Sequence, residues 1–366
     1  MRVLLLSDVN SAHTKRWATS LSQQGIDLAV FSISTPDENW TEAHGISLHT
    51  PMRFQTGIFS SRLIAKSLFL KLVPHLKKVI RQFNPDIVHA HYATSYGMLG
   101  ALAGFHPFVI SVWGSDVLQF PKHSLVGKLI LHYNFKRADA ICSTSLSMIP
   151  EIQRYTRKNI LVVPFGIDLQ LFHPFQAANP FTPGTFIIGT IKALEPEYGI
   201  DLLIRTFHAV KQTHPEKHLK LLIVGGGRLE SELKNLAISI GISEDVVFQG
   251  KVPHHEVPMY YNMLDLFVAL SRTESFGVSV LEAAACEKPV VVSDVGGLPE
   301  VVENGVTGLV VPDNDLEAAV QAVESLMKNN DKAREMGQQG RIRVEAQYNW
   351  TDSVKRMTNV YQQLLR

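Results

Sequence analysis

A short apolar run, a turn and an amphipathic stretch follow one another along almost the whole chain. In the first half, the apolar runs fall at residues 3–6, 28–32, 87–90, 108–112, 140–143 and 160–163. The segments between them, such as 14–24 and 61–83, have the apolar spacing of helices. Short buried strands that alternate with helices of this length predict βαβ units and a parallel sheet. We therefore expect an α/β fold.

The same alternation starts again after a segment rich in proline. In the second half, the predicted strands are residues 186–191, 219–224, 246–249, 266–270, 290–293 and 308–311. The prolines that separate the two regions, and so mark a linker, are Pro164, Pro174, Pro180 and Pro183. A chain of 366 residues also exceeds one ordinary domain. We predict two doubly wound domains, residues 1–168 and 169–348, facing each other across a cleft at their strand ends, where ligands bind. Residues 349–366 should form a last helix that packs back on the first domain.

Composition is typical of a globular protein of the cytoplasm. Hydrophobic residues make up 45% and charged residues 19% of the chain, and no apolar run approaches the roughly 18 residues that span a bilayer. The first apolar run meets Asp8 too early for a secretory signal. Cys142 and Cys286 both lie in apolar segments, so we expect buried, reduced thiols and neither a disulfide framework nor a zinc cluster.

Charge is divided unevenly between the two halves, although the net charge is only +1. Residues 1–170 hold 17 Lys/Arg and 10 Asp/Glu, which gives +7, whereas residues 171–366 hold 18 and 24, which gives −6. A basic half joined to an acidic half predicts different partners for each.

The clearest chemical signal comes from Glu274 and Glu282, which stand eight positions apart. A strand should end at Leu270 and a helix should begin near Phe276, which presents free main-chain N–H groups and a helix N-terminus to an anion. Taken alone, such a pair of glutamates also fits a charge that complements the helix dipole, followed by a solvated residue. Glu282, however, stands among apolar residues and alanines. A buried carboxylate needs hydrogen-bond donors, and ribose hydroxyls would supply two.

This segment, residues 271–285, resembles the motif of two glutamates in glycosyltransferase family 4. The resemblance covers nearly the whole second domain, through Gly-Lys-Val at 250–252, Asp-Leu-Phe-Val at 265–268, Lys-Pro-Val-Val-Val at 288–292, Gly-Gly-Leu-Pro-Glu at 296–300 and Asn-Gly-Val-Thr-Gly-Leu-Val at 304–310. The first domain is similar more loosely, at 85–92 and 163–168. The resemblance implies a GT-B fold with two Rossmann-like domains, and a retaining transferase that uses a nucleotide sugar.

The resemblance also implies roles for residues of the second domain. Glu274 would hold hydroxyls of the donor sugar and take part in catalysis, and Glu282 would hold the ribose. Main-chain amides would face the sugar and the diphosphate at Phe276, Gly277 and Val278.

The glycine run that begins at Gly225 and Gly226 would line the same donor pocket, and Val252 would contact the base. As a dinucleotide fingerprint the run is weak, because Glu230 stands where a third glycine should be. A dehydrogenase is therefore disfavoured.

One departure from the family concerns the diphosphate. Members place an Arg after the first strand of this domain and a Lys just before a glycine. Lys192 fits the first role, which makes it both a donor-binding and a catalytic candidate, but Glu197 or Tyr198 occupies the place of the second cation. Either Lys192 and the helix dipole suffice for the diphosphate, or another cation replaces the missing one, and Arg272 is our candidate.

In the first domain, two residues are candidates for catalysis. His91 follows a buried strand, where a lone histidine is more often structural, but with His89, Tyr92 and the loop 113–116 a role in the cleft is equally compatible. Asp116 keeps its place in the family pattern. The acceptor-side candidates are Ser11, His13, Tyr92 and Trp113. Trp113 stands where many members have His, and Ser11 could instead cap the first helix.

Residues 59–81 combine six basic residues with an apolar pattern. A solvated basic face and a peripheral contact with an anionic membrane are both compatible with this pattern. Nucleic acid is disfavoured, since no interleaving of aromatic and basic residues occurs.

The sequence thus predicts a metal-independent, cofactor-free retaining glycosyltransferase of the cytoplasm, and association with the inner face of the cell membrane stays open. The donor would be a nucleotide sugar, with a UDP-sugar favoured and GDP-mannose as the alternative. The acceptor would be a glycan or lipid-linked saccharide of cell-surface polysaccharide or glycolipid assembly. The rival functions are a nucleotide-sugar epimerase of the same architecture and a non-catalytic partner that binds sugar nucleotide.

Overall fold

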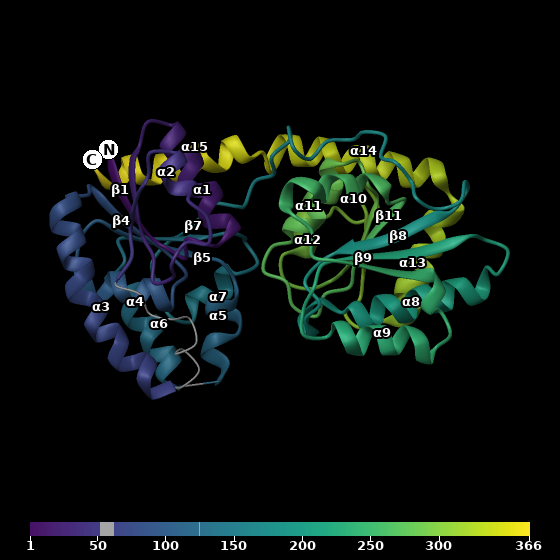
Figure 1. Cartoon of the computed structure of the whole chain (residues 1–366), viewed down its shortest axis with the longest axis horizontal. Coiled ribbons are helices and arrows are strands. Elements are labelled where there is room, and N and C mark those ends of the chain that lie inside the picture. The colour runs from purple at the N-terminus through teal and green to yellow at the C-terminus, as the bar shows by residue number, and fades with distance from the viewer. Residues whose placement is uncertain (52–61, 124) are drawn as a thin grey trace. The chain divides into compact units, whose positions relative to one another are not determined.

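The computed structural model describes residues 1–51, 62–123 and 125–366, which divide into two compact units (Figure 1). The first unit comprises Met1–Pro164 together with Ser353–Arg366, and the second comprises Phe165–Asp352. Each unit contains one parallel sheet with helices packed on it, so the predicted α/β fold of two Rossmann-like domains is confirmed.

The first unit is built on a seven-stranded sheet in the order β3-β2-β1-β4-β5-β6-β7. Its strands are β1 (Arg2–Leu6), β2 (Asp27–Phe31), β3 (Ser47–His49), β4 (Ile87–His91), β5 (Phe108–Val112), β6 (Ala140–Ser143) and β7 (Ile160–Val162). All neighbouring strands are parallel. The order reverses between β1 and β4, and doubly wound folds bind ligands at the carboxyl ends of the strands at such a point.

Helices cover both faces of this sheet (Figure 1). On one face lie α3, α4 and α6, and on the other lie α1 and the C-terminal helix α15. The helices of the unit are α1 (Ala12–Gln23), α2 (Trp40–Ala43), α3 (Arg62–Phe83), α4 (Ser95–Ala103), α5 (Ser115–Leu118), α6 (Leu125–Arg137), α7 (Ile149–Gln153) and most of α15 (Trp350–Leu364). Because both faces are covered, β1, β4 and β5 are almost entirely buried, and their buried residues are apolar apart from His89, His91 and Ser111.

The second unit has a six-stranded parallel sheet in the order β10-β9-β8-β11-β12-β13. Its strands are β8 (Phe186–Ile191), β9 (Leu219–Val224), β10 (Val246–Gly250), β11 (Leu266–Ala269), β12 (Val290–Ser293) and β13 (Leu309–Val311). The order reverses between β8 and β11, which are hydrogen-bonded neighbours. The loops after these two strands therefore start side by side.

The helices of the second unit also lie on two faces of its sheet (Figure 1). One layer holds α8 (Ile200–Thr213), α9 (Glu230–Ser239) and α13 (Leu316–Lys328), and the other holds α10 (Val257–Met263), α11 (Val278–Ala285), α12 (Leu298–Val301) and α14 (Asn330–Gln347). The first layer packs a continuous apolar core against the sheet. In the second layer, α11 contacts α14.

The proline-rich segment is less of a linker than its composition predicts. Ile167 and Phe172 are fully buried in the second unit, where Ile167 pairs with Asn349 and the Phe172 ring lies 6.0 Å from that of Tyr261. Most of residues 173–184 are exposed. Apolar residues between the prolines thus anchor the first part of the segment on a domain core.

The C-terminal helix α15 is tied to the first unit by a buried histidine. Tyr361 and His89 are both fully buried, and the Tyr361 hydroxyl lies 2.6 Å from His89 Nδ1. The other ring nitrogen of His89 lies 2.8 Å from Ser111 Oγ on β5. Burial lowers the pKa of His89 to about 3, so the ring is neutral at physiological pH.

This buried ring predicts that the first unit loses stability in acid. Since the ordinary pKa of histidine is near 6.5, the unfolded chain binds a proton between pH 6.5 and 3 that the folded chain does not. His89 alone should therefore lower the free energy of unfolding by about 1.4 kcal/mol per pH unit well inside that range. Urea unfolding followed at pH 7, 6 and 5 by tryptophan fluorescence measures this slope. His89→Gln should reduce it by about that amount, and an unchanged slope would contradict the assignment.

Candidate active site

The loops that follow β8 and β11 bring Lys192 and Glu274 into contact. Lys192 comes directly after β8, and Glu274 lies between β11 and α11. Lys192 Nζ and Glu274 Oε2 form an ion pair, and only 9% and 11% of the two side chains are exposed. The ammonium group also lies 4.7 Å from the centre of the Tyr198 ring, which is within cation–π range. Two residues that the sequence places in one pocket are thus neighbours.

Glycines fix the main chain on both sides of this ion pair. Gly225 has φ +135°, and a Cβ there would lie 1.9 Å from the carbonyl oxygen of Lys192. Gly296 has φ +51°, and a Cβ there would lie 1.7 Å from the carbonyl oxygen of Glu274. The next glycine, Gly297, donates its N–H to that same oxygen at 3.1 Å. Only glycine permits such close approaches. Gly225 therefore packs against the main-chain carbonyl of Lys192, a contact that the sequence does not predict.

Glu282 is a buried residue of α11 and not a solvated one. The residue is 8% exposed. Its Oε2 accepts a hydrogen bond of 2.9 Å from the Tyr261 hydroxyl, and its Oε1 lies 3.6 Å from His254 Nε2. Burial and the charge of Glu282 raise the pKa of Tyr261 well above its ordinary value, so the tyrosine remains a donor. Tyr261 fixes one carboxylate oxygen, and the other is directed toward the half-exposed ring of His254.

Two other predicted donor residues, Gly277 and Val278, lie at the start of the helix that carries Glu282. Gly277 is the N-cap of α11 with φ 109°, and Val278 is the first residue of the helix. Phe276 as a whole residue is 1% exposed, and its ring packs between Phe165 and Tyr348, so the predicted contact between its main chain and the donor stays a prediction.

Gly226 contacts the side chain of Lys251, the residue that precedes Val252. A Cβ on Gly226 would lie 3.0 Å from Lys251 Cγ, so the stem of this lysine covers the glycine. Val252 follows it, just after β10, and is half-buried.

Arg272 makes contacts that argue against its predicted role. Its Nη1 and Nη2 bind the two carboxylate oxygens of Asp201 at 2.8 and 2.7 Å, and Nη1 also donates to the Pro196 carbonyl at 3.1 Å. The hydrogen bond from Arg272 lowers the pKa of Asp201. The main-chain N–H groups of Arg272 and Thr273 donate to the Glu197 carbonyl at 2.8 and 3.2 Å. With its guanidinium engaged in this way, Arg272 fixes the loop, and its predicted contact with the diphosphate stays a prediction.

In the first unit, three of the acceptor-side candidates and His91 form an aromatic cluster. The Trp113 ring lies 4.6 Å from His91, 5.5 Å from Tyr92 and 5.6 Å from His13. These residues come from the carboxyl ends of β4 and β5 and from the start of α1. Tyr92 has φ 76°, an unfavourable value for a residue with a side chain, and such strain is common at functional sites.

His91 is buried beneath that cluster. It is 1% exposed, and its Nδ1 lies 3.0 Å from Ser7 Oγ. Burial, followed by the neighbouring His89 and His13, lowers its pKa well below the ordinary value. A neutral, enclosed ring of this kind supports Trp113 and does not favour the predicted catalytic role.

Asp116 also has a main-chain role. It is 1% exposed, and its two oxygens accept hydrogen bonds of 2.8 Å from the N–H groups of Ala93 and Gly114. Burial raises the pKa of this carboxyl group, and the main-chain donors oppose the shift. Asp116 thus joins the loop after β4 to the loop after β5, which is a positioning role, and its predicted part in catalysis stays a prediction.

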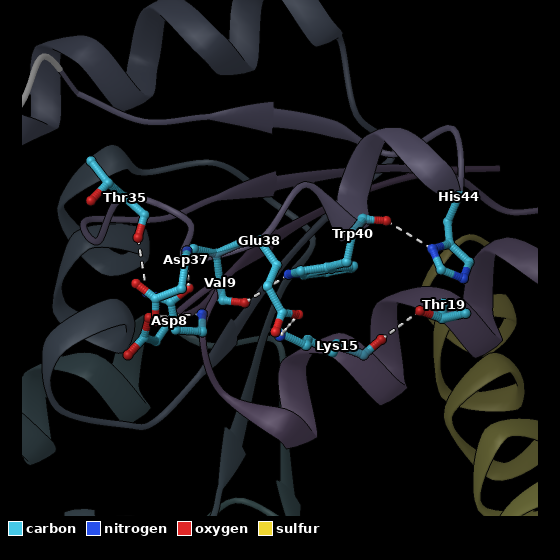
Figure 2. Close-up of polar contacts among 10 residues, drawn as sticks. Asp8, Val9, Lys15, Thr19, Thr35, Asp37, Glu38, Trp40 and His44 are labelled. Atoms are coloured by element: carbon cyan, nitrogen blue, oxygen red, sulfur yellow. Dashed lines mark hydrogen bonds and ion pairs between the residues drawn. The ribbon is translucent and has the colours of Figure 1, made fainter. Parts of the chain in front are cut away.

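Ser11 stands at the N-cap of α1, but its side chain makes no capping bond. The loop before it is cross-linked to the loop after β2 (Figure 2). Asn10 binds the Thr35 carbonyl and the Asp37 N–H at 2.8 and 2.9 Å. Trp40 Nε1 donates to the Val9 carbonyl at 3.0 Å, and Lys15 pairs with Glu38 at 2.7 Å. These pairs span more than twenty residues of chain, and no local pattern marks them.

The described residues contain neither a metal-binding cluster nor a membrane-spanning helix. Within residues 1–51, 62–123 and 125–366, no group of three or more His, Cys, Asp and Glu side chains could hold a metal ion. In the same part of the chain, no helix has both the length and the apolar content needed to cross a membrane.

Comparison with known proteins gives matches along both units. Residues 174–343 match the family "Glycosyl transferases group 1", and residues 2–145 match the family "Glycosyl transferase 4-like". The chain is 30% identical over 303 residues to the GDP-mannose-dependent alpha-(1-6)-phosphatidylinositol monomannoside mannosyltransferase of Mycolicibacterium smegmatis, covering 75% of this chain and 76% of that protein.

Two solved structures show the same fold. Sucrose-phosphate synthase from Thermosynechococcus elongatus is 22% identical with a TM-score of 0.83, over 100% of this chain and 99% of that one. Anabaena HepE in complex with UDP and glucose is 17% identical with a TM-score of 0.78, over 99% of this chain and 100% of that one. With the family matches to both units, these findings show that the chain belongs to the group 1 glycosyltransferases of family 4, which have the GT-B fold.

Proposed function

We propose that this glycosyltransferase is a retaining enzyme that transfers a sugar from a nucleotide-sugar donor to a lipid-linked glycan acceptor in cell-surface polysaccharide or glycolipid assembly. The observations that carry the proposal are the ion pair of Lys192 and Glu274 at the carboxyl ends of β8 and β11, and the buried Glu282 in α11, the helix that follows β11. These residues combine a cation for a diphosphate with two carboxylates for hydroxyl groups, which together match the chemistry of a nucleotide sugar.

Each of these groups has a distinct task in the proposed reaction. Lys192 and the main-chain N–H groups at the start of α11 stabilise the negative charge that develops on the departing diphosphate. Glu274 accepts hydrogen bonds from hydroxyls of the donor sugar. Glu282, whose orientation Tyr261 fixes, accepts them from the ribose. Because the cations and donors all belong to the protein, the proposed chemistry needs no metal.

Two donors are compatible with this arrangement. Anabaena HepE was solved with UDP and glucose, which supports a UDP-sugar. The Mycolicibacterium smegmatis relative is named as GDP-mannose-dependent and acts on a phosphatidylinositol mannoside, which supports GDP-mannose and an acceptor carried on a lipid. In this proposal, the base of the nucleotide contacts Val252. This residue follows β10 and is half-buried.

The first unit exposes features that suit a peripheral contact with an anionic membrane. Of the predicted segment 59–81, residues 59–61 lie outside the described residues, and for 62–70 the structure describes the helix but not the side chains. In the remainder of α3, apolar residues face the core, and the exposed basic residues are Lys71, Lys77, Lys78 and Arg81.

The helix α6 lies on the same face of the sheet as α3 (Figure 1), and it exposes apolar side chains. Leu125 is 78% and Leu129 is 67% exposed, one helical turn apart. On α6 itself, Lys128 is exposed next to these leucines, and exposed apolar residues together with basic ones are typical of helices that lie in the surface of a bilayer. These two features support the membrane side of the proposal.

Transfer itself is tested by product analysis. The full chain is incubated with radiolabelled UDP-glucose or GDP-mannose and a lipid-linked saccharide acceptor. We expect a labelled glycolipid whose new bond has the anomeric configuration of the donor, and we expect the rate to survive EDTA. An isomerised donor would indicate an epimerase, and intact donor with every acceptor would indicate a binding protein. Loss of activity on chelation, restored by Mn²⁺ or Mg²⁺, would contradict the metal-independent mechanism.

The ribose assignment predicts a loss of donor affinity in Glu282→Ala. Removal of a charged hydrogen-bond acceptor should cost roughly 1.5–3 kcal/mol, which is about ten- to more than a hundredfold in Kd. Calorimetric titration with the nucleotide sugar measures this change. The matched control is Glu317→Ala, which alters an exposed glutamate in the first turn of α13 and should leave Kd unchanged. Equal affinities in a folded Glu282→Ala protein would show that this carboxylate does not bind the ligand.

The membrane contact predicts binding that depends on charge. Each basic residue near an anionic surface contributes about 1 kcal/mol, so vesicles rich in anionic lipid should bind the protein at low salt and release it at high salt. The triple change Lys71→Glu, Lys77→Glu and Lys78→Glu should abolish co-sedimentation with these vesicles but leave transfer to a soluble acceptor analogue intact. Equal sedimentation with neutral and anionic vesicles would leave these lysines as a solvated helix face.

A further inference from the structure

The cation at the end of β8 is neutralised by a carboxylate of the same site. Lys192 and Glu274 pair in a largely water-excluded position, where charges interact more strongly than they do in water. Two nearby arginines, Arg272 and Arg228, are turned to other carboxylates. The cation that we assign to the diphosphate is therefore already engaged before any ligand binds.

Glycosyl transfer changes the charge of the ligand at this point. The bond between C1 of the sugar and the diphosphate oxygen breaks, and its electron pair stays on that oxygen. The acceptor oxygen bonds to C1, and the acceptor proton leaves to solvent. A nucleotide sugar of charge about −2 thus becomes a nucleoside diphosphate of charge close to −3 at neutral pH, since the second pKa of a phosphate monoester is about 6.

We propose that Glu274 makes the site prefer the nucleotide sugar over the nucleoside diphosphate, because it acts as the internal counter-ion of Lys192. This inference rests on the proposed function. While the donor is bound, sugar hydroxyls donate to Glu274 and compensate it for the loss of Lys192. After transfer these hydroxyls leave with the sugar. The bare carboxylate then repels a diphosphate that has gained charge, and it competes with that diphosphate for Lys192.

The main chain around the two residues favours rapid return of this ion pair. Gly225 packs against the carbonyl of Lys192, and Gly296 packs against the carbonyl of Glu274. The loop that bears Glu274 is also held by the two N–H···O bonds from residues 272 and 273 to Glu197. With the main chain fixed in this way, only side chains need to move when Lys192 leaves the diphosphate. The Tyr198 ring lies beside the ammonium group in the paired state.

The test compares two affinities in one variant. Kd values for UDP and UDP-glucose, and for GDP and GDP-mannose, are measured by calorimetry on the full chain. Glu274→Gln keeps the size of the side chain but removes its charge. This variant should lower the Kd of the nucleoside diphosphate by about tenfold. The Kd of the nucleotide sugar should fall by less. The ratio of the two Kd values should therefore change. Glu274→Ala removes the same charge and should also lower the Kd of the nucleoside diphosphate.

The matched control is Glu282→Gln, the same substitution at the other glutamate of the motif. The ribose is common to both ligands, so this variant should weaken both and leave their ratio unchanged. If Glu274→Gln and Glu274→Ala leave the diphosphate Kd unchanged or raise it, Glu274 is not a counter-ion and the inference fails while the proposed function stands. If the wild-type chain binds none of the four nucleotides, both the inference and the proposed function fail.

Discussion

The reversal of strand order in each sheet decides where this chain can present chemical groups. All strands are parallel, so the loops that follow them emerge at one edge of each sheet. At the reversal, the helices that follow the two neighbouring strands pack on opposite faces, which leaves the loop ends between them open to a ligand. Lys192 and Glu274 follow β8 and β11, the two strands on either side of the reversal in the second unit. Their ion pair is a direct result of this topology.

Main-chain contacts determine how accurately those loops are held. At Gly199, a Cβ would lie 1.9 Å from the Leu270 carbonyl, just where the loop toward Glu274 begins. Together with Gly225 and Gly296, this glycine brings three loops closer than any side chain would permit. Arg272 adds a bidentate bond to Asp201 across the same loops. The polar side chains of the site thus rest on a support that is largely main chain, which limits the freedom of the loops that carry them.

Much of this architecture could be predicted from local sequence, because a buried parallel strand and its following helix each leave a periodic pattern. The strands of both sheets were predictable in this way, apart from the three-residue edge strand β3. Glu282 could be assigned to a buried place because apolar residues surround it. The partners of these residues could not be predicted, since Tyr261 meets Glu282 from a different helix and Asp201 meets Arg272 across 71 positions. The position of Asp116 in the sequence suggested a catalytic group. Its carboxylate oxygens accept hydrogen bonds from main-chain N–H groups of two loops, which the sequence does not show.

The course of the chain has a consequence for the order in which the enzyme is made. The first unit is discontinuous, because it needs Ser353–Arg366 as well as Met1–Pro164, whereas the second unit is a single stretch of chain. On a ribosome, all of the second unit emerges before Ser353–Arg366 does. The N-terminal unit, although it is synthesised first, is therefore the last to be completed, and until then the nitrogen of His89 that faces Tyr361 lacks its partner. Removal of the last fourteen residues would damage the domain that is farthest from them in sequence.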